Sequence, residues 1–270
     1  MTEYTRLAGG GGAVSAAFFD LDRTLISGSS AFTLAVEARR AGFIKNGEFL
    51  RDAAGAATFK LFGASDDTSE QVRTRILAAV TGMAQADLVA LNSEVLPRLI
   101  ARVRPEAKWL LDRHRKAERD TYIVSAAPQE IVEPLAHSLG MTGGIGTRSH
   151  VEDGVYTGEL DGPFCYGPGK VEAITAIARW HGYDLDQSYG YSDSASDLPM
   201  LEAVGHPVAV NPDSALERRA RRDGWPIVIF SQRTKAVVRR SLAGVGTLGV
   251  GAAGFVVGRR TGSDTRRRRR

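Results

Sequence analysis

Cysteine, histidine and long apolar runs are scarce in this sequence, and each shortage removes a class of protein. The 270 residues contain one cysteine, Cys165, so no disulfide framework can form within the chain. The five histidines show neither the HxxxH nor the HExxH spacing of zinc enzymes, and the GxSxG motif of serine hydrolases does not occur. The start MTEYTRLAGGGG lacks the basic and apolar segments of a secretion signal, which favours a reducing cytoplasm.

What is present is a globular composition with an uneven distribution of charge. Hydrophobic residues make up 43% of the chain, enough for one large core or two unequal ones. The formal net charge is +4, but residues 233–270 carry eleven Lys or Arg and one acid, a net +10. The first 232 residues therefore carry about −6, and we expect an acidic body with a basic tail.

Short apolar runs alternate with amphipathic segments, which predicts an α/β fold with a parallel sheet and right-handed crossovers. The runs have the length and composition of strands buried on both faces, and they lie at residues 13–19, 121–124, 188–191 and 207–210. Helical periodicity lies between these runs, for example at residues 131–139 and 170–181. An Asp-Gly pair predicts a hairpin over residues 151–157.

Three stretches do not follow this alternation, and they suggest how the chain is divided into domains. Residues 28–100 carry amphipathic helical patterns and almost no strand pattern, so we expect an inserted all-helical cap. Residues 13–27 and 101–232 would then form a catalytic core around a Rossmann-like parallel sheet. Residues 1–12 end in four glycines and are expected to form a flexible arm, whereas residues 233–270 form the basic, Gly-rich tail.

Acidic pairs follow two of the predicted strands. Asp20 and Asp22 come directly after the first strand, and Asp193 and Asp197 follow the strand at 188–191. Ligands bind at the carboxyl ends of parallel strands, and two carboxylates held close together repel unless a cation lies between them. Mg²⁺ suits such a site because it prefers oxygen ligands, although Asp20 could instead simply cap the following helix.

A hydroxyl and an ammonium group are expected at the same edge of the sheet. Ser125 ends the strand at 121–124, and Lys170 begins the helix at 170–181. Such donors stabilise the oxygens of a phosphoryl group and the negative charge that develops on them during transfer. The four acids, the hydroxyl and the ammonium therefore predict a phosphoryl-binding site.

The order DLDRT, Ser125, Lys170 and DSASD resembles the four motifs of the haloacid dehalogenase (HAD) superfamily. More narrowly it is similar to subfamily IB, the phosphoserine phosphatase-like branch, over residues 13–230. The resemblance implies the HAD fold with a helical cap after the first motif. It also implies a Mg²⁺-dependent phosphomonoester hydrolase, in which Asp20 is the nucleophile that becomes an aspartyl-phosphate and Asp22 is the general acid and base.

The same resemblance assigns the remaining site residues. Ser125 and Lys170 would hold the phosphoryl oxygens. Mg²⁺ would be bound by the Asp20 carboxylate, the Asp22 main-chain carbonyl and Asp193, with Asp197 in support.

Ser29 marks a departure from the family pattern. Phosphoserine-specific relatives carry a glutamate nine residues after the nucleophile, where it meets the ammonium group of the substrate; this chain has Ser29 there. The departure argues against phosphoserine and leaves a small or lipid-derived phosphate monoester as the expected substrate. Glu37 either compensates or is a solvated helix acid, and one of Arg73 and Arg75 could meet a substrate anion.

An uncharged stretch of eighteen residues, 241–258, lies between two arginine pairs in the tail. Because it is short for a bilayer span and contains six glycines, three interpretations stay open: a membrane anchor, an interfacial segment held by its arginines, or a disordered tail. The expected location is therefore cytoplasmic, with membrane association through this tail as an option.

The sequence of the tail gives little support for binding of a dinucleotide or a nucleic acid. Its two GxGxxG matches lack the strand and the following acid of a dinucleotide site, so we expect no NAD. The arginines at 266–270 have no interleaved aromatic residues, so no specific nucleic acid is expected. The alternative function is a non-enzymatic or regulatory protein with this fold that acts at a membrane.

Overall fold

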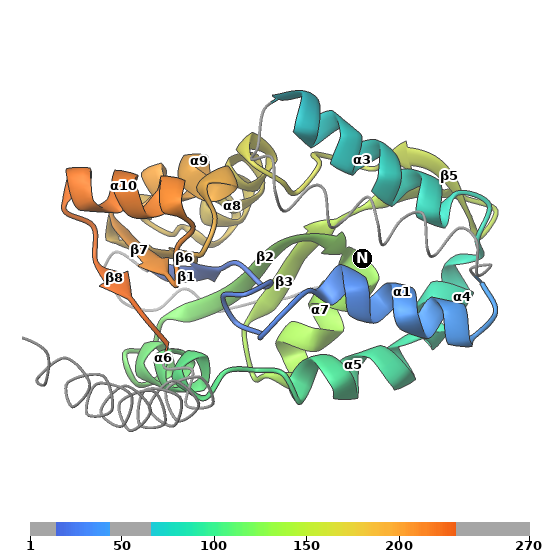
Figure 1. Cartoon of the computed structure of the whole chain (residues 1–270), viewed down its shortest axis with the longest axis horizontal. Coiled ribbons are helices and arrows are strands. Elements are labelled where there is room, and N and C mark those ends of the chain that lie inside the picture. The colour runs from blue at the N-terminus through green and yellow to red at the C-terminus, as the bar shows by residue number, and fades with distance from the viewer. Residues whose placement is uncertain (1–14, 44–65, 231–270) are drawn as a thin grey trace, which may run out of the picture. The chain divides into compact units, whose positions relative to one another are not determined.

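A six-stranded parallel sheet forms the centre of the computed structural model, which describes residues 15–43 and 66–230 (Figure 1). In spatial order β3-β2-β1-β6-β7-β8, its strands are Gly143–Thr147, Asp120–Pro128, Ala16–Phe19, Tyr189–Ser192, His206–Val210 and Ile227–Val228. The first strand in the sequence thus lies in the interior of the sheet. Phe19 of β1 pairs with Ile123 of β2 on one side and Tyr191 of β6 on the other.

Helices cover both faces of this sheet. The core helices are α6 (Pro105–Lys116), α7 (Gln129–Ser138), α8 (Pro168–His181), α9 (Leu198–Glu202) and α10 (Ser214–Asp223). Phe18 packs in one cluster with Ile174 of α8 and Met200 of α9, whereas the ring of Phe19 contacts His114 of α6. Since neighbouring strand residues point to opposite faces, α6 lies on one face and α8 and α9 lie on the other.

The burial of β1 explains its unbroken apolar sequence. All four of its residues are buried, with at most 1% of any side chain exposed. Burial of a side chain as large as Phe18 stabilises the fold by roughly 2–3 kcal/mol. A strand covered on both faces therefore needs no polar alternation.

Between β1 and α6 the described chain forms further helices, which we call the cap. They are α1 (Ser30–Arg40), α3 (Asp66–Val80), α4 (Gln85–Ala90) and α5 (Asn92–Ile100). A hairpin of β4 (Ser149–Glu152) and β5 (Val155–Leu160) pairs with the cap, because the Gln85 N–H donates to the Gly154 carbonyl at 2.9 Å. The hairpin, which lies within the range 101–232, thus packs against the cap. The boundaries of the core, 13–27 and 101–232, and of the cap, 28–100, stay predictions.

The predicted parallel α/β fold with a helical insertion is confirmed, and the differences lie in individual elements. All four predicted strands are present with shifted ends, and the Asp-Gly turn at 153–154 joins β4 to β5. The strand β3 was not predicted because its sequence, GGIGT, contains no apolar run. A Cβ at Gly144 would lie 2.5 Å from the Val132 carbonyl oxygen, so this glycine lets α7 approach the sheet closely.

Several predictions lie outside the described residues. These are the arm at 1–12 and the tail at 233–270, including the stretch 241–258. Within residues 15–43 and 66–230, no helix is both long and apolar enough to cross a membrane. The described residues up to Ile229 belong to one compact unit, which contains the whole site discussed below.

Candidate active site

Lys170 joins two acids that come from different parts of the chain. Its Nζ lies 2.7 Å from Asp20 Oδ1 and 2.9 Å from Asp197 Oδ2, and its side chain is 3% exposed. Burial opposes the charge on the ammonium group, but Asp197 and Asp20 outweigh it and hold the pKa of Lys170 well above its usual value. A fixed positive charge therefore lies at the carboxyl end of β1.

The sequence Gly167-Pro168-Gly169 places Lys170 in the first turn of α8. Gly167 has a φ of 52°, in the left-handed region that glycine adopts without strain, and Pro168 occupies the start of the helix. A Cβ at Gly169 would lie 1.8 Å from the Phe164 carbonyl oxygen, so no other residue fits there without a shift. These residues direct the lysine side chain into the site.

Asp20 continues the β1–β6 ladder, because its N–H donates to the Tyr191 carbonyl at 2.9 Å. Burial raises the pKa of Asp20 from 3.8 to about 7; Lys170 lowers it, while repulsion from Asp197 and Asp22 adds to the rise. Lys170 thus offsets only part of the cost of burying a charged carboxylate at this position.

Asp22 is held by the first helix of the cap. Its Oδ1 accepts a hydrogen bond from the Ser30 N–H at 2.7 Å. Burial raises the pKa of Asp22, whereas the Ser30 backbone and the Ser30 and Ser29 hydroxyls oppose that rise. The N-terminus of α1, with its partial positive charge, therefore orients this carboxylate.

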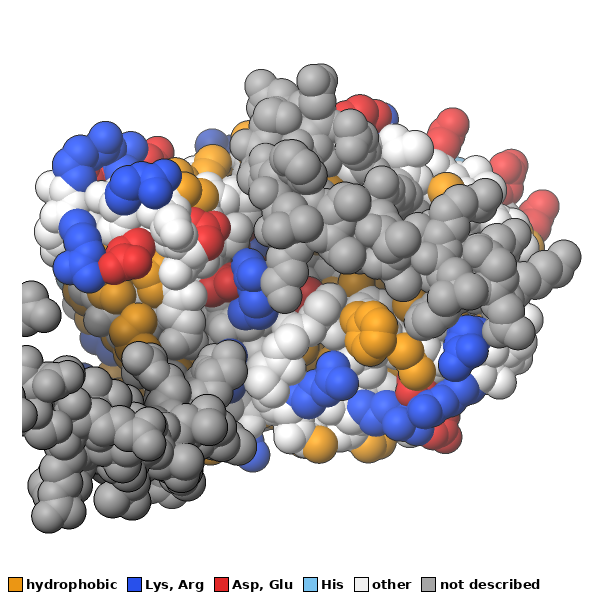
Figure 2. Space-filling model, viewed as in Figure 1, with side chains coloured by type: hydrophobic (Ala, Val, Ile, Leu, Met, Phe, Trp, Pro, Cys, Tyr) orange, Lys and Arg blue, Asp and Glu red, His pale blue; other side chains and the backbone are white. Residues whose placement is uncertain are grey.

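Asp193 is paired with Arg23, whose Nε lies 2.7 Å from Asp193 Oδ2. Burial, followed by repulsion from Asp20, raises the pKa of Asp193 to about 8, although Arg23 lowers it. Arg23 has a φ of 61°, a conformation uncommon for residues other than glycine, directly after the first acidic pair. Figure 2 shows acidic and basic side chains close together at the centre of this face.

The loop after β6 is fixed by Asp213, which sequence analysis missed. The Asp213 N–H donates to the Asp193 carbonyl at 2.8 Å, and Asp213 Oδ2 accepts from the Ala195 N–H at 2.9 Å. Its Oδ1 also caps α10. The available signal was an acid shortly after a third predicted strand, the one ending at Val210.

Asp197 binds the ammonium group of Lys170 in this structure. Its Oδ2 accepts hydrogen bonds both from Lys170 and, at 2.6 Å, from the Ser192 hydroxyl. The carboxylate expected in support of a metal therefore acts as a buried counter-ion that holds the lysine in place.

Ser125 lies on the adjacent strand at the same edge, two residues beyond Ile123, the partner of Phe19. It is 5% exposed, and its Oγ accepts a hydrogen bond from the Ala127 N–H at 3.2 Å. Nearby, burial raises the pKa of the Cys165 thiol to about 12, while Lys170 lowers it only in part. Cys165 is therefore a protonated thiol and no nucleophile.

The expectation of a solvated acid at Glu37 is wrong. Glu37 is 3% exposed, and its Oε1 lies 2.9 Å from Arg40 Nη1 and 3.1 Å from Arg98 Nε. It is therefore a buried acid already neutralised by two arginines. Arg73 pairs with Glu70 at 2.9 Å on the surface of α3, and the side chain of Arg75 lies outside the described residues.

The charges at this edge suit a divalent cation. The four carboxylates of Asp20, Asp22, Asp193 and Asp197 face Lys170 and Arg23, which leaves a formal charge of −2. Within the described residues no three His, Cys, Asp or Glu side chains form a metal cluster. The set expected from the family, two carboxylates and a main-chain carbonyl, stays a prediction; its oxygen atoms are of the kind that Mg²⁺ prefers, and Mg²⁺ keeps several waters.

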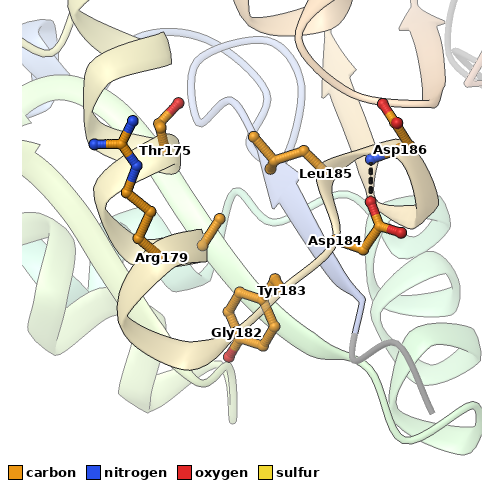
Figure 3. A pocket seen from close by; sticks show the side chains of 8 residues that line it. Thr175, Arg179, Gly182, Tyr183, Asp184, Leu185 and Asp186 are labelled. Carbon is orange, nitrogen blue, oxygen red and sulfur yellow. Dashed lines mark hydrogen bonds between the residues drawn. The ribbon is translucent and has the colours of Figure 1, made fainter.

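A cavity of about 490 Å³ lies elsewhere, at the end of α8 and the segment before β6 (Figure 3). Its lining includes Arg179, Tyr183 and Asp184, and the Asp186 N–H donates to Asp184 Oδ1 at 2.9 Å. These residues precede β6, so the cavity is at the amino edge of the sheet, opposite the acids. Ligands of such folds bind at the carboxyl edge, so this cavity is not the candidate site.

Comparisons with known proteins agree with this geometry. Residues 17–202 match the haloacid dehalogenase-like hydrolase family. The chain is 40% identical to an inhibition of morphological differentiation protein of Streptomyces azureus, over 88% of this chain and 90% of that protein. It is 36% identical to a phosphoserine phosphatase of Mycobacterium tuberculosis, over 89% of this chain and 78% of that protein.

A solved structure of a Bordetella pertussis protein with unknown function is similar as well. It has a TM-score of 0.70 and 27% identity, over 80% of this chain and 99% of that one. The predicted recognition of the superfamily and of its phosphoserine phosphatase-like branch is confirmed. A match over more than half of its length shows that this chain belongs to the haloacid dehalogenase-like hydrolase family.

Proposed function

We propose that the chain is a Mg²⁺-dependent phosphatase that hydrolyses phosphate monoesters through an aspartyl-phosphate on Asp20. The observation that carries this proposal is the buried Lys170, which lies 2.7 Å from Asp20 and 2.9 Å from Asp197. A buried, unbalanced group of charges is costly to fold, and such groups are typical of catalytic sites.

The reaction has two steps. In the first, an Asp20 oxygen attacks phosphorus and the ester P–O bond breaks, while Asp22 donates a proton to the departing alcohol. In the second, Asp22 takes a proton from water, the water oxygen attacks phosphorus, and the P–O bond to Asp20 breaks. Inorganic phosphate leaves, and both carboxyl groups return to their initial states.

The remaining side chains hold charge in place during these steps. Lys170 and Ser125 bind the phosphoryl oxygens, and Asp197 and Ser192 keep Lys170 in position. Asp20, Asp193 and the Asp22 carbonyl would hold Mg²⁺, which supplies positive charge that orients the phosphoryl group and stabilises its oxygens.

The proposed substrate is a small or lipid-derived phosphate monoester other than phosphoserine. The M. tuberculosis relative is named a phosphoserine phosphatase, which favours an amino acid substrate. Against that, the position expected to carry the ammonium-binding acid is Ser29, which caps α1 by accepting from the Phe32 N–H. Glu37 cannot replace that acid because Arg40 and Arg98 already neutralise it.

Phosphate release from a panel of metabolite esters with Mg²⁺ tests the proposal. Asp20→Asn is expected to lower turnover by about a thousandfold or more, because the nucleophile is lost. Asp186→Asn, an exposed acid at the amino edge, serves as the matched control and should retain activity. Full activity in Asp20→Asn, or no release from any ester by the wild type, would contradict the proposal.

A regulatory role is the second candidate. It is favoured by the S. azureus relative, whose name refers to inhibition of morphological differentiation. If binding alone produced the effect, Asp20→Asn would retain the full cellular effect of the wild type. Loss of that effect in Asp20→Asn, but not in Asp186→Asn, would favour catalysis.

We further propose a cytoplasmic location with membrane association through residues 241–258 and their flanking arginines. The support is the sequence pattern of the tail. Co-sedimentation with anionic vesicles tests it: the full chain should bind, and a chain ending at residue 232 should not. Equal sedimentation of both chains would contradict the proposal.

A further inference from the structure

We propose that Arg23 selects substrates whose leaving alcohol carries an anionic group such as a carboxylate. This inference rests on the proposed function and names the substrate class of the same site. Its starting point is the position of the guanidinium, whose Nε lies 2.7 Å from Asp193 Oδ2 while the side chain is 45% exposed. The group is thus anchored to the acid cluster and also open to solvent.

The backbone directs Arg23 towards the site. Its φ is 61°, and its N–H donates to the Gly28 carbonyl at 3.1 Å, which closes the loop between β1 and the cap. A left-handed conformation at a long side chain is unfavourable and persists only where the surrounding structure imposes it. Here it turns the side chain towards Asp193 on the neighbouring strand end.

Arg23 also follows directly after Asp22, the proposed proton donor to the leaving alcohol. Its guanidinium is bonded to Asp193, which lies near enough to Asp20 for the two acids to repel each other, so a group attached to that alcohol can reach Arg23. The contact with Asp193 uses Nε, whereas the two Nη groups carry the remaining donors of the guanidinium. Those donors suit a carboxylate, which arginine binds through paired hydrogen bonds.

Within α1, the described part of the cap that begins beside Asp22, the acid is already paired with arginines. The face of α1 that begins at Ser30 continues with the buried residues Thr33 and Glu37. Thr33 accepts a hydrogen bond from Arg102 Nη1 at 2.9 Å, and Glu37, the one acid of α1, is paired with two arginines. A leaving group with an ammonium would meet arginines here, whereas an anionic one would be attracted.

Three phosphate esters of two-carbon alcohols differ mainly in the charge of the leaving group. They are phosphoglycolate (anionic), ethyl phosphate (neutral) and aminoethyl phosphate (cationic). With full-length protein and Mg²⁺, we expect kcat/KM to fall in that order, with phosphoglycolate ahead of ethyl phosphate by about tenfold or more. In Arg23→Gln the ratio of the first two should fall about tenfold, mainly through KM, and Arg23→Lys should retain part of it. Arg115→Gln, on α6 at the amino edge, should keep the wild-type ratio.

Equal wild-type values for phosphoglycolate and ethyl phosphate, or the same loss for both esters in Arg23→Gln, would overturn the inference. Calorimetric binding of the two esters separates it from the proposed function. If no ester is hydrolysed, not even p-nitrophenyl phosphate, the proposed function fails; tighter binding of phosphoglycolate than of ethyl phosphate, lost in Arg23→Gln, would still support the role of Arg23. No such difference in binding would overturn it.

Discussion

The two edges of the sheet both carry buried polar groups, but the charges of their acids are compensated in different ways. At the amino edge, the Tyr183 hydroxyl donates to Asp120 Oδ2 at 2.6 Å and lies 2.9 Å from the Tyr122 hydroxyl. Asp120 there also accepts a hydrogen bond from the Thr142 hydroxyl at 3.0 Å. At the carboxyl edge, Asp20 and three other acids face two cations, and burial raises the pKa of Asp20 to about 7.

This difference separates polar groups that stabilise the fold from polar groups that do chemistry. Hydrogen bonds of the first kind, from hydroxyl groups to a single carboxylate, add about 1.5–3 kcal/mol each and require no ligand. A buried excess of charge is unfavourable until a cation or a substrate compensates it. The carboxyl edge therefore combines a stability cost with reactivity, and the following changes test that assignment.

Lys170→Met should have the largest effect. We expect kcat/KM to fall by about a thousandfold, because the charge facing the phosphoryl oxygens is lost. Thermal and urea unfolding should also show a loss of about 3 kcal/mol, since Asp20 and Asp197 then lack their common partner. Lys108→Met, exposed on α6, is the control; a small effect at position 170 would place the catalytic charge elsewhere.

Ser30→Ala should have a smaller effect that depends on the leaving group. If the start of α1 orients Asp22 for proton transfer, alkyl phosphates should lose about tenfold in kcat, whereas p-nitrophenyl phosphate, whose leaving group needs little protonation, should lose about twofold or less. Ser30→Thr should restore part of the loss, and exposed Ser93→Ala should change neither rate. Equal losses for both esters would show that Ser30 does not act through Asp22.

Stability without divalent cations should depend on pH through Asp193. Its pKa is about 8 when folded and near 3.8 when unfolded, so the folded chain binds this proton more tightly. Stability should therefore fall as pH rises between these values, by at least about 1 kcal/mol between pH 6 and pH 8.5 in a chelating buffer. Asp193→Asn should flatten that slope; an unchanged slope would contradict the assigned charge balance.

Tyr183→Phe should have the smallest effect on activity, and it sharpens the contrast between the two edges of the sheet. The variant loses the hydrogen bond to the Asp120 carboxylate, which should reduce the free energy of unfolding by about 1.5–3 kcal/mol. Its kcat/KM should stay within about twofold of the wild type, because the amino edge does not contact the reacting atoms. A tenfold loss of activity would remove the distinction drawn between the two edges.

The site residues at the strand ends could be predicted from the sequence because their positions depend on neighbouring residues in the chain. The run that forms β1 is apolar throughout, so it predicts a buried strand with Asp20 at its end, and Lys170 follows the Gly-Pro-Gly start of a helix. The glycine-rich β3 could not be predicted this way, because its glycines reflect the close approach of α7 rather than any strand preference.

The contacts that refine the site depend on distant segments. The hydrogen bond from Ser30 to Asp22 requires the cap helix to begin beside the core, and the contact of Arg23 with Asp193 requires an uncommon φ. Glu37 was misjudged because its partner Arg98 lies on α5, far along the chain. Side-chain pairing across an inserted subdomain leaves no periodic signal in the sequence.

The central claim is that Asp20 carries the phosphoryl group during turnover. Wild-type protein and Asp20→Asn would be quenched while hydrolysing an ester with Mg²⁺, treated with borohydride, digested and analysed by mass spectrometry. Borohydride reduces an aspartyl-phosphate to homoserine, so the account predicts homoserine at residue 20 in the wild type and none in the variant. Phosphate release with homoserine at another aspartate, or with residue 20 unmodified, would contradict it.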